Sequence, residues 1–577
     1  MRSNVLFHFR SFYSVVRSML AKLQTLTLSG IDALPVDVEI DICHGSSAVT
    51  LVGLPSQVVK ESIQRVMRAL ENSGFTTPGN SILINLAPAE MHKQAASFDL
   101  PIAIGLLAGQ GQVPFERLEE YVLVGELALD GQLRPIRGAL SMALACEKLR
   151  TRNPRLRGLI LPAENAAEAA VVESIEVIPV SSISQLLAFI LGDLEIDPSP
   201  SRLEEIYAAH SQYDLDFADV RGQEMAKRAM MIAAAGAHNM LMIGPPGSGK
   251  TMLAKRLPSV LPELLPSESV ETTRIYSSMG KISSRTPLIV RRPFRSPHHT
   301  ISDSGMVGGG SIPAPGEISL AHNGVLFLDE LPEFSRRTLE VLRQPLEDRE
   351  VTISRAQATA TFPSDFMLIA AMNPCPCGFR GDLRRQCNCS VPMIERYMSK
   401  ISGPLLDRID IHVEVPAVPY EDLSVASTST GTSSADIRRE VLRARQIQAR
   451  RFGYVLRNFD SRFDLGISAD AEVPADADSR SSMGSDVQGS VSSASSGRVL
   501  YNAQMTTRQI RQFCQLDQQS IQQLRAAMHQ FGLSARAHDK VLRIARTIAD
   551  LDGSENIQAD HLAEAINYRI LDRNLWT

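Results

Sequence analysis

A glycine-rich segment near the middle of the 577-residue chain constrains the fold more than any other feature. A short apolar run, residues 238–243, precedes it, and a helix-forming run, residues 252–257, follows it. The segment itself consists of Gly244, Pro245, Pro246, Gly247, Ser248, Gly249, Lys250 and Thr251. Glycines let a backbone wrap closely around a phosphate chain, and the N–H groups at the start of a helix then face that anion. The strand–loop–helix pattern therefore predicts a phosphate-binding loop and a nucleotide hydrolase.

The last two residues of this loop suit a nucleotide bound with magnesium. The Lys250 ammonium can reach β- and γ-phosphates, and the Thr251 hydroxyl can hold Mg²⁺. A glycine-rich turn that matches by accident is the alternative, and the strand and helix on either side argue against it. We therefore expect ATP and Mg²⁺ at this loop.

A second apolar strand ends in two acids. Residues 324–328 are apolar throughout, which is typical of a buried parallel strand, and Asp329 and Glu330 follow directly. Open α/β sheets bind ligands at the carboxyl ends of their strands. We expect Asp329 to hold Mg²⁺ through its waters and Glu330 to polarise the attacking water. A solvated acidic pair at a strand end is the weaker alternative beside such a loop.

Length and charge limit the remaining possibilities. The length predicts about three or four domains, and the net charge of −5 excludes a global basic field, so any DNA contact needs local basic patches. No apolar run approaches the roughly 18–20 residues that cross a bilayer. Residues 1–18 carry three arginines and no acid, but they have no continuous apolar core. We interpret them as an upstream extension of the kind that a misassigned start produces, and we expect a cytoplasmic protein without membrane contact.

The N-terminal region resembles the proteolytic domain of the Lon protease family. Residues 124–136 and 159–162 carry this resemblance, which implies an α+β fold. Lon-type enzymes have Ser-Ala-Gly where this chain has Asp99, Leu100 and Pro101, and the helix that would hold their catalytic lysine, residues 138–146, has none. A Ser/Lys dyad needs both groups, and neither Ser97 nor Ser141 has a partner in the sequence. We therefore expect a protease-like fold without protease activity, used for assembly or partner binding.

Further segments resemble AAA+ ATPases. Residues 217–223 are similar to the entry segment that cradles the adenine base. A third apolar strand, residues 366–372, ends in Asn373, whose amide could hold the attacking water or the γ-phosphate, as sensor 1 does in that family.

Two arginines follow from the same resemblance. Arg408 lies in the motif of residues 403–410, whose arginine reaches the neighbouring subunit's nucleotide, and a surface salt bridge is the alternative for it. Ser534 is a candidate N-cap of a helix that resembles sensor 2 of the AAA+ helical lid. The resemblance implies that Arg536 reaches the γ-phosphate of its own subunit.

Four of the seven cysteines cluster in the sequence, as Cys375, Cys377, Cys387 and Cys389. Four thiolates on two short turns could bind Zn²⁺ tetrahedrally. The spacing is C-x-C rather than the commoner C-x-x-C, so reduced thiols in a loop remain the alternative. The other three cysteines are scattered and do not form a secreted disulfide framework.

Two basic excursions interrupt the nucleotide-binding module. The first contains Arg291, Arg292 and Arg295, and the second, residues 350–362, predicts a β-hairpin with Arg355 near its turn. Insertions at these places mark the AAA+ clade of magnesium chelatases and minichromosome-maintenance helicases. These four arginines are the candidate DNA contacts.

With the Lon-like region in front, the chain resembles the magnesium-chelatase-like AAA+ ATPases of the ComM or YifB type. The resemblance implies a homo-hexameric ring that hydrolyses ATP, moves along single-stranded or branched DNA and promotes branch migration in recombination or natural transformation. A metal-insertion motor of the magnesium chelatase type and a chaperone or regulatory adaptor that binds protein partners are the alternatives. Their ATP site would use the same Lys250, Glu330, Asn373, Arg408 and Arg536.

The expected class is α/β multidomain, with an α+β Lon-like N-terminal domain, an AAA+ P-loop α/β core and a C-terminal helical lid. The expected boundaries are an extension at 1–18, the Lon-like domain at 19–193, a linker at 194–213, the ATPase core at 214–421, a helix with a serine-rich segment at 422–506, and the lid at 507–577.

Overall fold

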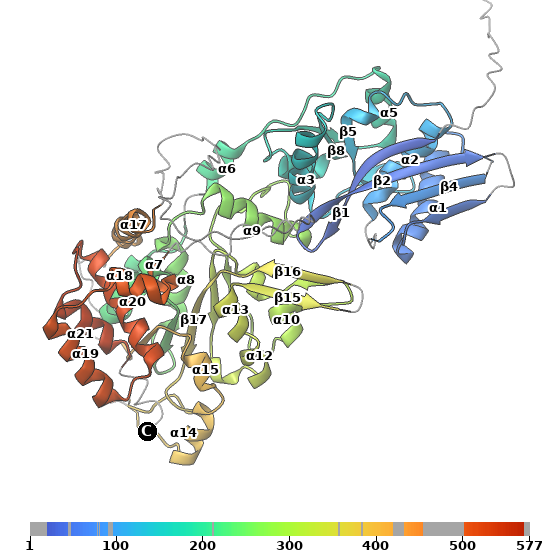
Figure 1. Cartoon of the computed structure of the whole chain (residues 1–577). Coiled ribbons are helices and arrows are strands. Elements are labelled where there is room, and N and C mark those ends of the chain that lie inside the picture. The colour runs from blue at the N-terminus through green and yellow to red at the C-terminus, as the bar shows by residue number, and fades with distance from the viewer. Residues whose placement is uncertain are drawn as a thin grey trace, which may run out of the picture. The chain divides into compact units, whose positions relative to one another are not determined.

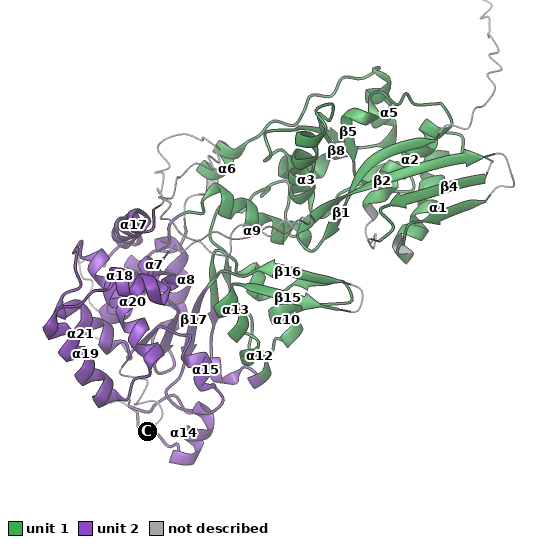
Figure 2. Ribbon diagram, viewed as in Figure 1, with its two compact units in different colours: residues 1–213, 263–326, 337–366 green, residues 214–262, 327–336, 367–577 purple. Residues whose placement is uncertain are grey.

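The computed structural model (Figure 1) describes residues 20–43, 48–77, 79, 81–90, 96–210, 213–355, 358–381, 385–418, 432–453 and 501–569. The predicted extension at 1–18 and most of the serine-rich segment, residues 454–500, lie outside the described residues. The chain divides into two compact units (Figure 2). Unit 1 comprises residues 1–213, 263–326 and 337–366, and unit 2 comprises residues 214–262, 327–336 and 367–577. Each unit combines helices with parallel strands, which confirms the expected mixed α/β class.

Unit 1 begins with a four-stranded sheet in the order β1-β2-β4-β3. Its strands are β1 (Ala21–Ser29), β2 (Asp32–Cys43), β3 (Val49–Val52) and β4 (Ser81–Ala87). From Val36 to Ile42 of β2 every second residue is buried, as the alternation in the sequence predicts. Helix α2 (Asp99–Gly109) packs on β1 and β2, and α1 (Gln57–Asn72) packs beside α2.

A second sheet in unit 1 has three parallel strands in the order β5-β8-β9. These are β5 (Tyr121–Leu123), β8 (Gly158–Pro162) and β9 (Glu176–Val180), and a short hairpin joins β6 (Glu126–Leu127) to β7 (Leu133–Arg134). The adjoining helices are α3 (Ala139–Arg152), α4 (Ala166–Ala169) and α5 (Ile183–Leu191). The predicted linker contains a further helix, α6 (Leu203–His210), because Leu203 and Tyr207 are buried in the same core as β8.

The rest of unit 1 comes from the insertions. Its helices are α9 (Pro266–Ser278), α10 (Asp303–Val307), α11 (Glu317–Leu320), α12 (Arg336–Glu340) and α13 (Arg343–Asp348), and its strands are β11 (Phe294–Arg295), β12 (Gly308–Gly309), β13 (Ala314–Pro315), β15 (Glu350–Ser354) and β16 (Thr359–Pro363). Strands β15 and β16 pair antiparallel, which confirms the predicted hairpin. Helix α9 packs against α3, and Arg274 donates hydrogen bonds to Ser141 Oγ (3.4 Å) and the Ile31 carbonyl (3.2 Å).

Unit 2 is built on parallel strands in the order β14-β17-β10-β18, where β14 (Val325–Leu328) contributes its last two residues. The others are β17 (Met367–Met372), β10 (Met240–Ile243) and β18 (Ile411–Glu414). Its helices are α7 (Glu224–Gly236), α8 (Lys250–Val260), α14 (Val391–Met398), α15 (Gly403–Leu406), α17 (Ser434–Arg451), α18 (Thr507–Phe513), α19 (Gln518–Phe531), α20 (Ala535–Leu551) and α21 (Ala559–Asn567). Among the described residues, no helix is long and apolar enough to span a membrane.

Candidate nucleotide-binding site

The glycine-rich loop connects a buried strand to a helix in unit 2. All four residues of β10 are buried, and α8 begins at Lys250. Gly247 and Gly249 have φ of 76° and 92°, in the left-handed region that glycine adopts most easily. Gly244 is required for a different reason, because a Cβ there would lie 2.1 Å from the Val415 carbonyl oxygen. The loop can therefore expose its backbone N–H groups at the start of α8.

Lys250 holds its ammonium inside the loop. Nζ donates to the carbonyl oxygens of Gly244 (2.7 Å) and Pro245 (2.9 Å), and to Asn373 Oδ1 at 3.3 Å. Burial lowers the pKa of Lys250, and the carboxylates of Asp329 and Glu330 act against that shift. The structure thus brings together Lys250, Gly244, Pro245 and Asn373, four of the residues that the sequence predicts for the ATP site.

The acidic end of β14 faces the other loop residue. Thr251 Oγ1 donates to Asp329 Oδ2 at 2.6 Å, and the Glu330 N–H donates to Asp329 Oδ1 at 3.0 Å. Glu330 is exposed and has φ of 51°, a left-handed conformation that is uncommon for a residue with a side chain. Such strain is typical of functional positions, where the surrounding fold imposes it.

Gln223 also contacts the loop, a role that sequence reasoning did not assign to it. Its side-chain amide donates to the carbonyl oxygens of Ser248 (3.2 Å) and Pro416 (2.5 Å). Gln223 has φ of 61° and directly precedes α7, so it joins the entry segment to the phosphate-binding loop. The adjacent Gly222, which also has a positive φ, is the sequence signal that could have indicated a tight turn here.

The two predicted arginines lie near one motif. Arg408 donates to the Pro404 carbonyl at 2.6 Å, inside its own segment. Arg536 lies in the first turn of α20, whose N-cap is Ser534 as predicted. It is 4.0 Å from Asp407, and two thirds of its side chain is exposed. The roles of both arginines at the nucleotide stay predictions.

A buried ionic cluster supports this part of unit 2 and was not predicted. Asp410 accepts from Lys540 of α20 (3.0 Å) and lies 3.4 Å from His238 Nδ1, just before β10. Burial acts to raise the pKa of Asp410, but Lys540 and His238 outweigh it and hold the pKa well below its usual range. The cluster joins α20 to the ends of β10 and β18.

The four candidate DNA arginines lie in unit 1 and differ in their surroundings. Arg292 is largely buried and donates to Glu268 (3.0 Å), and Arg295 forms a two-bond ion pair with Glu317 (2.6 and 2.7 Å). Both guanidinium groups are therefore engaged in ion pairs within the fold, and a DNA role for Arg292 and Arg295 stays a prediction. Arg291 is exposed and lies over the Tyr213 ring, and Arg355 is exposed at the end of β15.

Asp99, where the resemblance to Lon-type enzymes would place their nucleophile, forms a buried ion pair. Asp99 is fully buried and accepts from Arg65 (2.6 and 3.0 Å) and from the Leu127 N–H (3.1 Å). Burial raises the pKa of Asp99, and the Arg65 guanidinium acts against that rise. Ser141 donates to the Ile31 carbonyl at 2.6 Å, so it serves α3 packing. Whether a Ser/Lys dyad operates here stays a prediction from the sequence.

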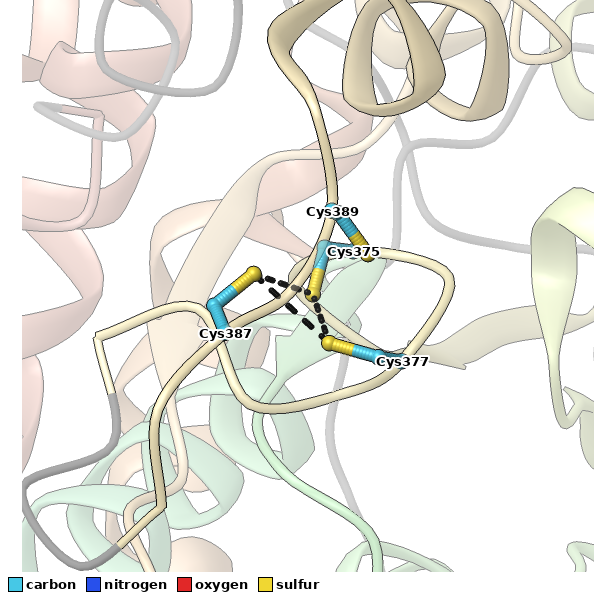
Figure 3. Close-up of side chains that lie close together, drawn as sticks. All are labelled: Cys375, Cys377, Cys387 and Cys389. Carbon is cyan, nitrogen blue, oxygen red and sulfur yellow. Dashed lines mark hydrogen bonds between the residues drawn. The ribbon is translucent and has the colours of Figure 1, made fainter.

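The four clustered cysteines converge in the connection between β17 and α14. Their ligand atoms all lie within 4.8 Å of one another, and Figure 3 shows the side chains around one small space. The sequence expectation that these residues could share one metal ion is therefore compatible with their placement.

The loop fits a nucleotide bound with magnesium by its own chemistry. Ser248 Oγ is buried and has no hydrogen-bond partner among the described residues, so it can face an added oxygen. The hydroxyl of Thr251 and the carboxylate of Asp329 are oxygen ligands of the kind that Mg²⁺ prefers. The cation of Lys250 and the helix N-terminus supply positive potential for phosphates.

Comparison with known proteins places this site in a family. The profile "Magnesium chelatase, subunit ChlI" matches residues 216–423, the profile "Subunit ChlI of Mg-chelatase" matches 38–165, and "Magnesium chelatase, subunit ChlI C-terminal" matches 431–569. YifB of Escherichia coli is 40% identical over 558 residues, which cover 96% of this chain and 98% of YifB. Competence protein ComM of Haemophilus influenzae is 40% identical over 548 residues, which cover 95% and 96% of the two chains.

A partial match concerns the N-terminal region. Lon protease 2 of Bacillus subtilis is 28% identical over 196 residues, covering 30% of this chain and 35% of that protein. The full-length matches are decisive for the family. The chain therefore belongs to the magnesium-chelatase-like family of AAA+ ATPases that includes ComM and YifB.

Proposed function

We propose that this protein is an ATP-hydrolysing ring motor that moves along DNA and promotes branch migration. The observation that carries the ATPase part is the buried Lys250 ammonium at the start of α8, beside the Thr251–Asp329 pair. A relative that is 40% identical is named a competence protein, which supports a role on DNA taken up by cells.

Each residue of the site has a chemical task in this proposal. Lys250 and the loop N–H groups bind the phosphates, and Thr251 and Asp329 hold Mg²⁺. Mg²⁺, when bound, neutralises charge on the phosphate oxygens. The Glu330 carboxylate accepts a proton from the attacking water, and the Asn373 amide orients that water. Arg408 from a neighbouring subunit and Arg536 stabilise the negative charge that develops during transfer.

The β15–β16 hairpin offers an exposed candidate surface for DNA. Val351, Ile353 and Phe362 are buried, while Thr352 and Thr361 form an exposed hydrogen-bonded pair on the opposite face. Hydroxyl groups and an exposed Arg355 suit contacts with a phosphate backbone and carry no base preference. Arg292 and Arg295 would shape the insertion through their ion pairs, and Arg291 adds a second exposed cation.

A regulatory adaptor that binds proteins is the second candidate. Strand β3 lies at the edge of its sheet, and Val52, Leu54 and Leu83 nearby are 39%, 50% and 44% exposed. Exposed apolar residues at an edge strand are typical of protein interaction surfaces. A metal-insertion motor is the third candidate, which the name of the matching profile favours.

The ATPase rate with and without DNA separates these candidates. We expect single-stranded and branched DNA to raise the rate, and Arg355→Ala to weaken DNA binding and lower the salt slope by about 1. Arg155→Ala, an exposed arginine of the N-terminal region, is the matched control and should respond as wild type does. If DNA neither binds nor changes the rate, the translocase proposal fails and the other candidates remain.

A mixing experiment tests the ring. Arg408→Ala and Lys250→Ala subunits should each be inactive alone. In mixed rings, an intact Lys250 from one subunit can meet an intact Arg408 from the other, so part of the activity should return. Mixtures that stay as inactive as their components would contradict the role of Arg408 across a subunit boundary.

A further inference from the structure

We propose that Cys375, Cys377, Cys387 and Cys389 bind one Zn²⁺ ion, and that this zinc centre holds the β17–α14 connection against the phosphate-binding loop. The positioning role rests on the proposed function of that loop, whereas the metal site does not.

Three of the four sulfur positions match a single tetrahedral ion, and the Cys389 sulfur lies within 4.8 Å of the other three. The Sγ–Sγ distances are 3.3 Å for Cys375–Cys377, 3.7 Å for Cys375–Cys387 and 3.6 Å for Cys377–Cys387. Zinc–sulfur bonds of about 2.3 Å place tetrahedral sulfurs about 3.8 Å apart. A disulfide needs a sulfur separation of about 2.0 Å, and all four cysteines are free thiols.

The site also excludes a larger cofactor. An iron–sulfur cluster spreads its thiolates over several iron atoms, so its cysteines stand farther apart than ligands of one ion. Four soft sulfur ligands around one position, three of them at tetrahedral spacing, select zinc among common divalent ions. The closed set leaves no position for water, which is the arrangement of a structural rather than a catalytic zinc site.

Backbone groups around the sulfurs are arranged as a metal-thiolate turn requires. The Gly378 N–H donates to the Cys375 carbonyl at 3.0 Å and closes the turn between the first two ligands. The N–H groups of Gly378 and Arg380 also bond to the Cys375 sulfur, and that of Phe379 bonds to the Cys377 sulfur. Such hydrogen bonds orient thiolates and stabilise their negative charge.

This turn lies directly on the nucleotide site. Gly378 has φ of 84°, and a Cβ there would lie 2.5 Å from Pro246 Cδ, so the turn and the phosphate-binding loop are in close contact. Asn373, which bonds to Lys250, is two residues before Cys375 in the chain. A metal that fixes the turn would therefore fix both Asn373 and Pro246.

Metal analysis of the full-length protein, purified without chelator or added metal, tests the site. We expect about one zinc per chain and no iron. Cys389→Ser should reduce zinc to less than about a tenth, while Cys389→His should retain it because imidazole is also a zinc ligand. Cys43→Ser, an exposed cysteine of the N-terminal region, is the control and should keep its zinc. Wild type without zinc, or with iron instead, would overturn the proposal.

Cobalt loading of the wild-type protein tests the metal site even if the Cys389→Ser variant does not fold. Wild-type protein stripped with chelator and loaded with Co²⁺ should show the intense visible bands of tetrahedral cobalt thiolate. A spectrum without them would overturn the site even if Cys389→Ser aggregates.

The positioning role has a separate readout. Stripping zinc should raise the KM for ATP about tenfold or more, and adding Zn²⁺ should restore it. An unchanged KM in stripped protein would overturn the positioning role. A zinc-loaded wild type with no ATP turnover would instead contradict the proposed function and leave the zinc site standing.

Discussion

Two helices of this molecule begin at a charged and buried residue. In one of them that charge has an oppositely charged partner, and in the other its hydrogen bonds go to neutral groups. Helix α2 of unit 1 begins at Asp99, and α8 of unit 2 begins at Lys250. Asp99 is neutralised by Arg65 in a fixed ion pair, whereas the hydrogen bonds of Lys250 go to neutral oxygens of Gly244, Pro245 and Asn373.

The helix dipole deepens this contrast. An anion at a helix N-terminus is stabilising, so Asp99 suits its position twice, through Arg65 and through the dipole. A lysine at the same position opposes the dipole, and its burial disfavours the charge. The chain therefore holds Lys250 where an anion would relieve both costs. We infer that Asp99 serves stability and that Lys250 serves phosphate binding.

The largest effect should come from removing that unrelieved charge. Lys250→Ala should lower ATP turnover by about 1000-fold or more, because one positioned donor to a developing anion has an effect of that order. Lys255→Ala, an exposed lysine of the same helix, is the matched control and should keep wild-type turnover. Steady-state phosphate release measures both. Substantial ATP turnover in Lys250→Ala would contradict the inference that Lys250, unlike Asp99, serves phosphate binding.

Breaking the buried Arg65–Asp99 ion pair should lower the stability of unit 1 and leave ATP hydrolysis unchanged. Arg65→Ala leaves the Asp99 carboxylate buried without its partner, which should cost about 3 kcal/mol of local stability. Hydrogen exchange of the α2 amides reads this loss locally, since a chain of two units need not unfold in one step. Arg68→Ala, whose partner Glu71 is exposed, should cost less than about 1 kcal/mol. Lost ATP turnover with α2 still protected would assign this region to the chemistry.

The smallest effect is the change in stability with pH that we expect from Asp410, a buried and ion-paired carboxylate in unit 2. Because its folded pKa is lowered, its contribution is present above the unfolded pKa and is lost as pH falls through the folded pKa. With an unfolded pKa of about 3.9, the loss at about pH 4 is on the order of 0.5 kcal/mol. Hydrogen exchange of the α20 amides near pH 7 and pH 4, each corrected for the intrinsic exchange rate at that pH, should show a shallower pH dependence in Asp410→Asn than in wild type.

Asp560→Asn controls for general charge, because Asp560 is exposed at the start of α21. Its pH dependence should match wild type. An equal change of pH dependence in both variants would contradict the lowered pKa that the structure indicates for Asp410.

Local patterns allowed much of this molecule to be predicted from the sequence. The phosphate-binding loop, the acidic end of β14 and the β15–β16 hairpin each depend on residues that are close in the chain. Helix α9 was missed because its buried face carries Ser269, Thr272 and Thr273, so it shows no apolar period.

Pairings between distant residues could not be predicted in the same way. The Lys540–Asp410 contact joins residues 130 positions apart, and a single sequence gives no signal for it. The arginines of the first insertion illustrate the same limit. The sequence marks them as candidate DNA contacts, and it gives no sign that Arg292 and Arg295 pair with Glu268 and Glu317 in the fold.

The most direct test of the account is ATP hydrolysis by Glu330→Gln, compared with wild type and with Glu333→Gln, whose side chain pairs with Lys400. The account predicts that Glu330→Gln binds ATP as tightly as wild type but turns it over at least about 100-fold more slowly, because the amide cannot accept the proton of the attacking water. Glu333→Gln should hydrolyse ATP normally. Wild-type turnover in Glu330→Gln would contradict the assignment of this strained, exposed carboxylate as the base of the site.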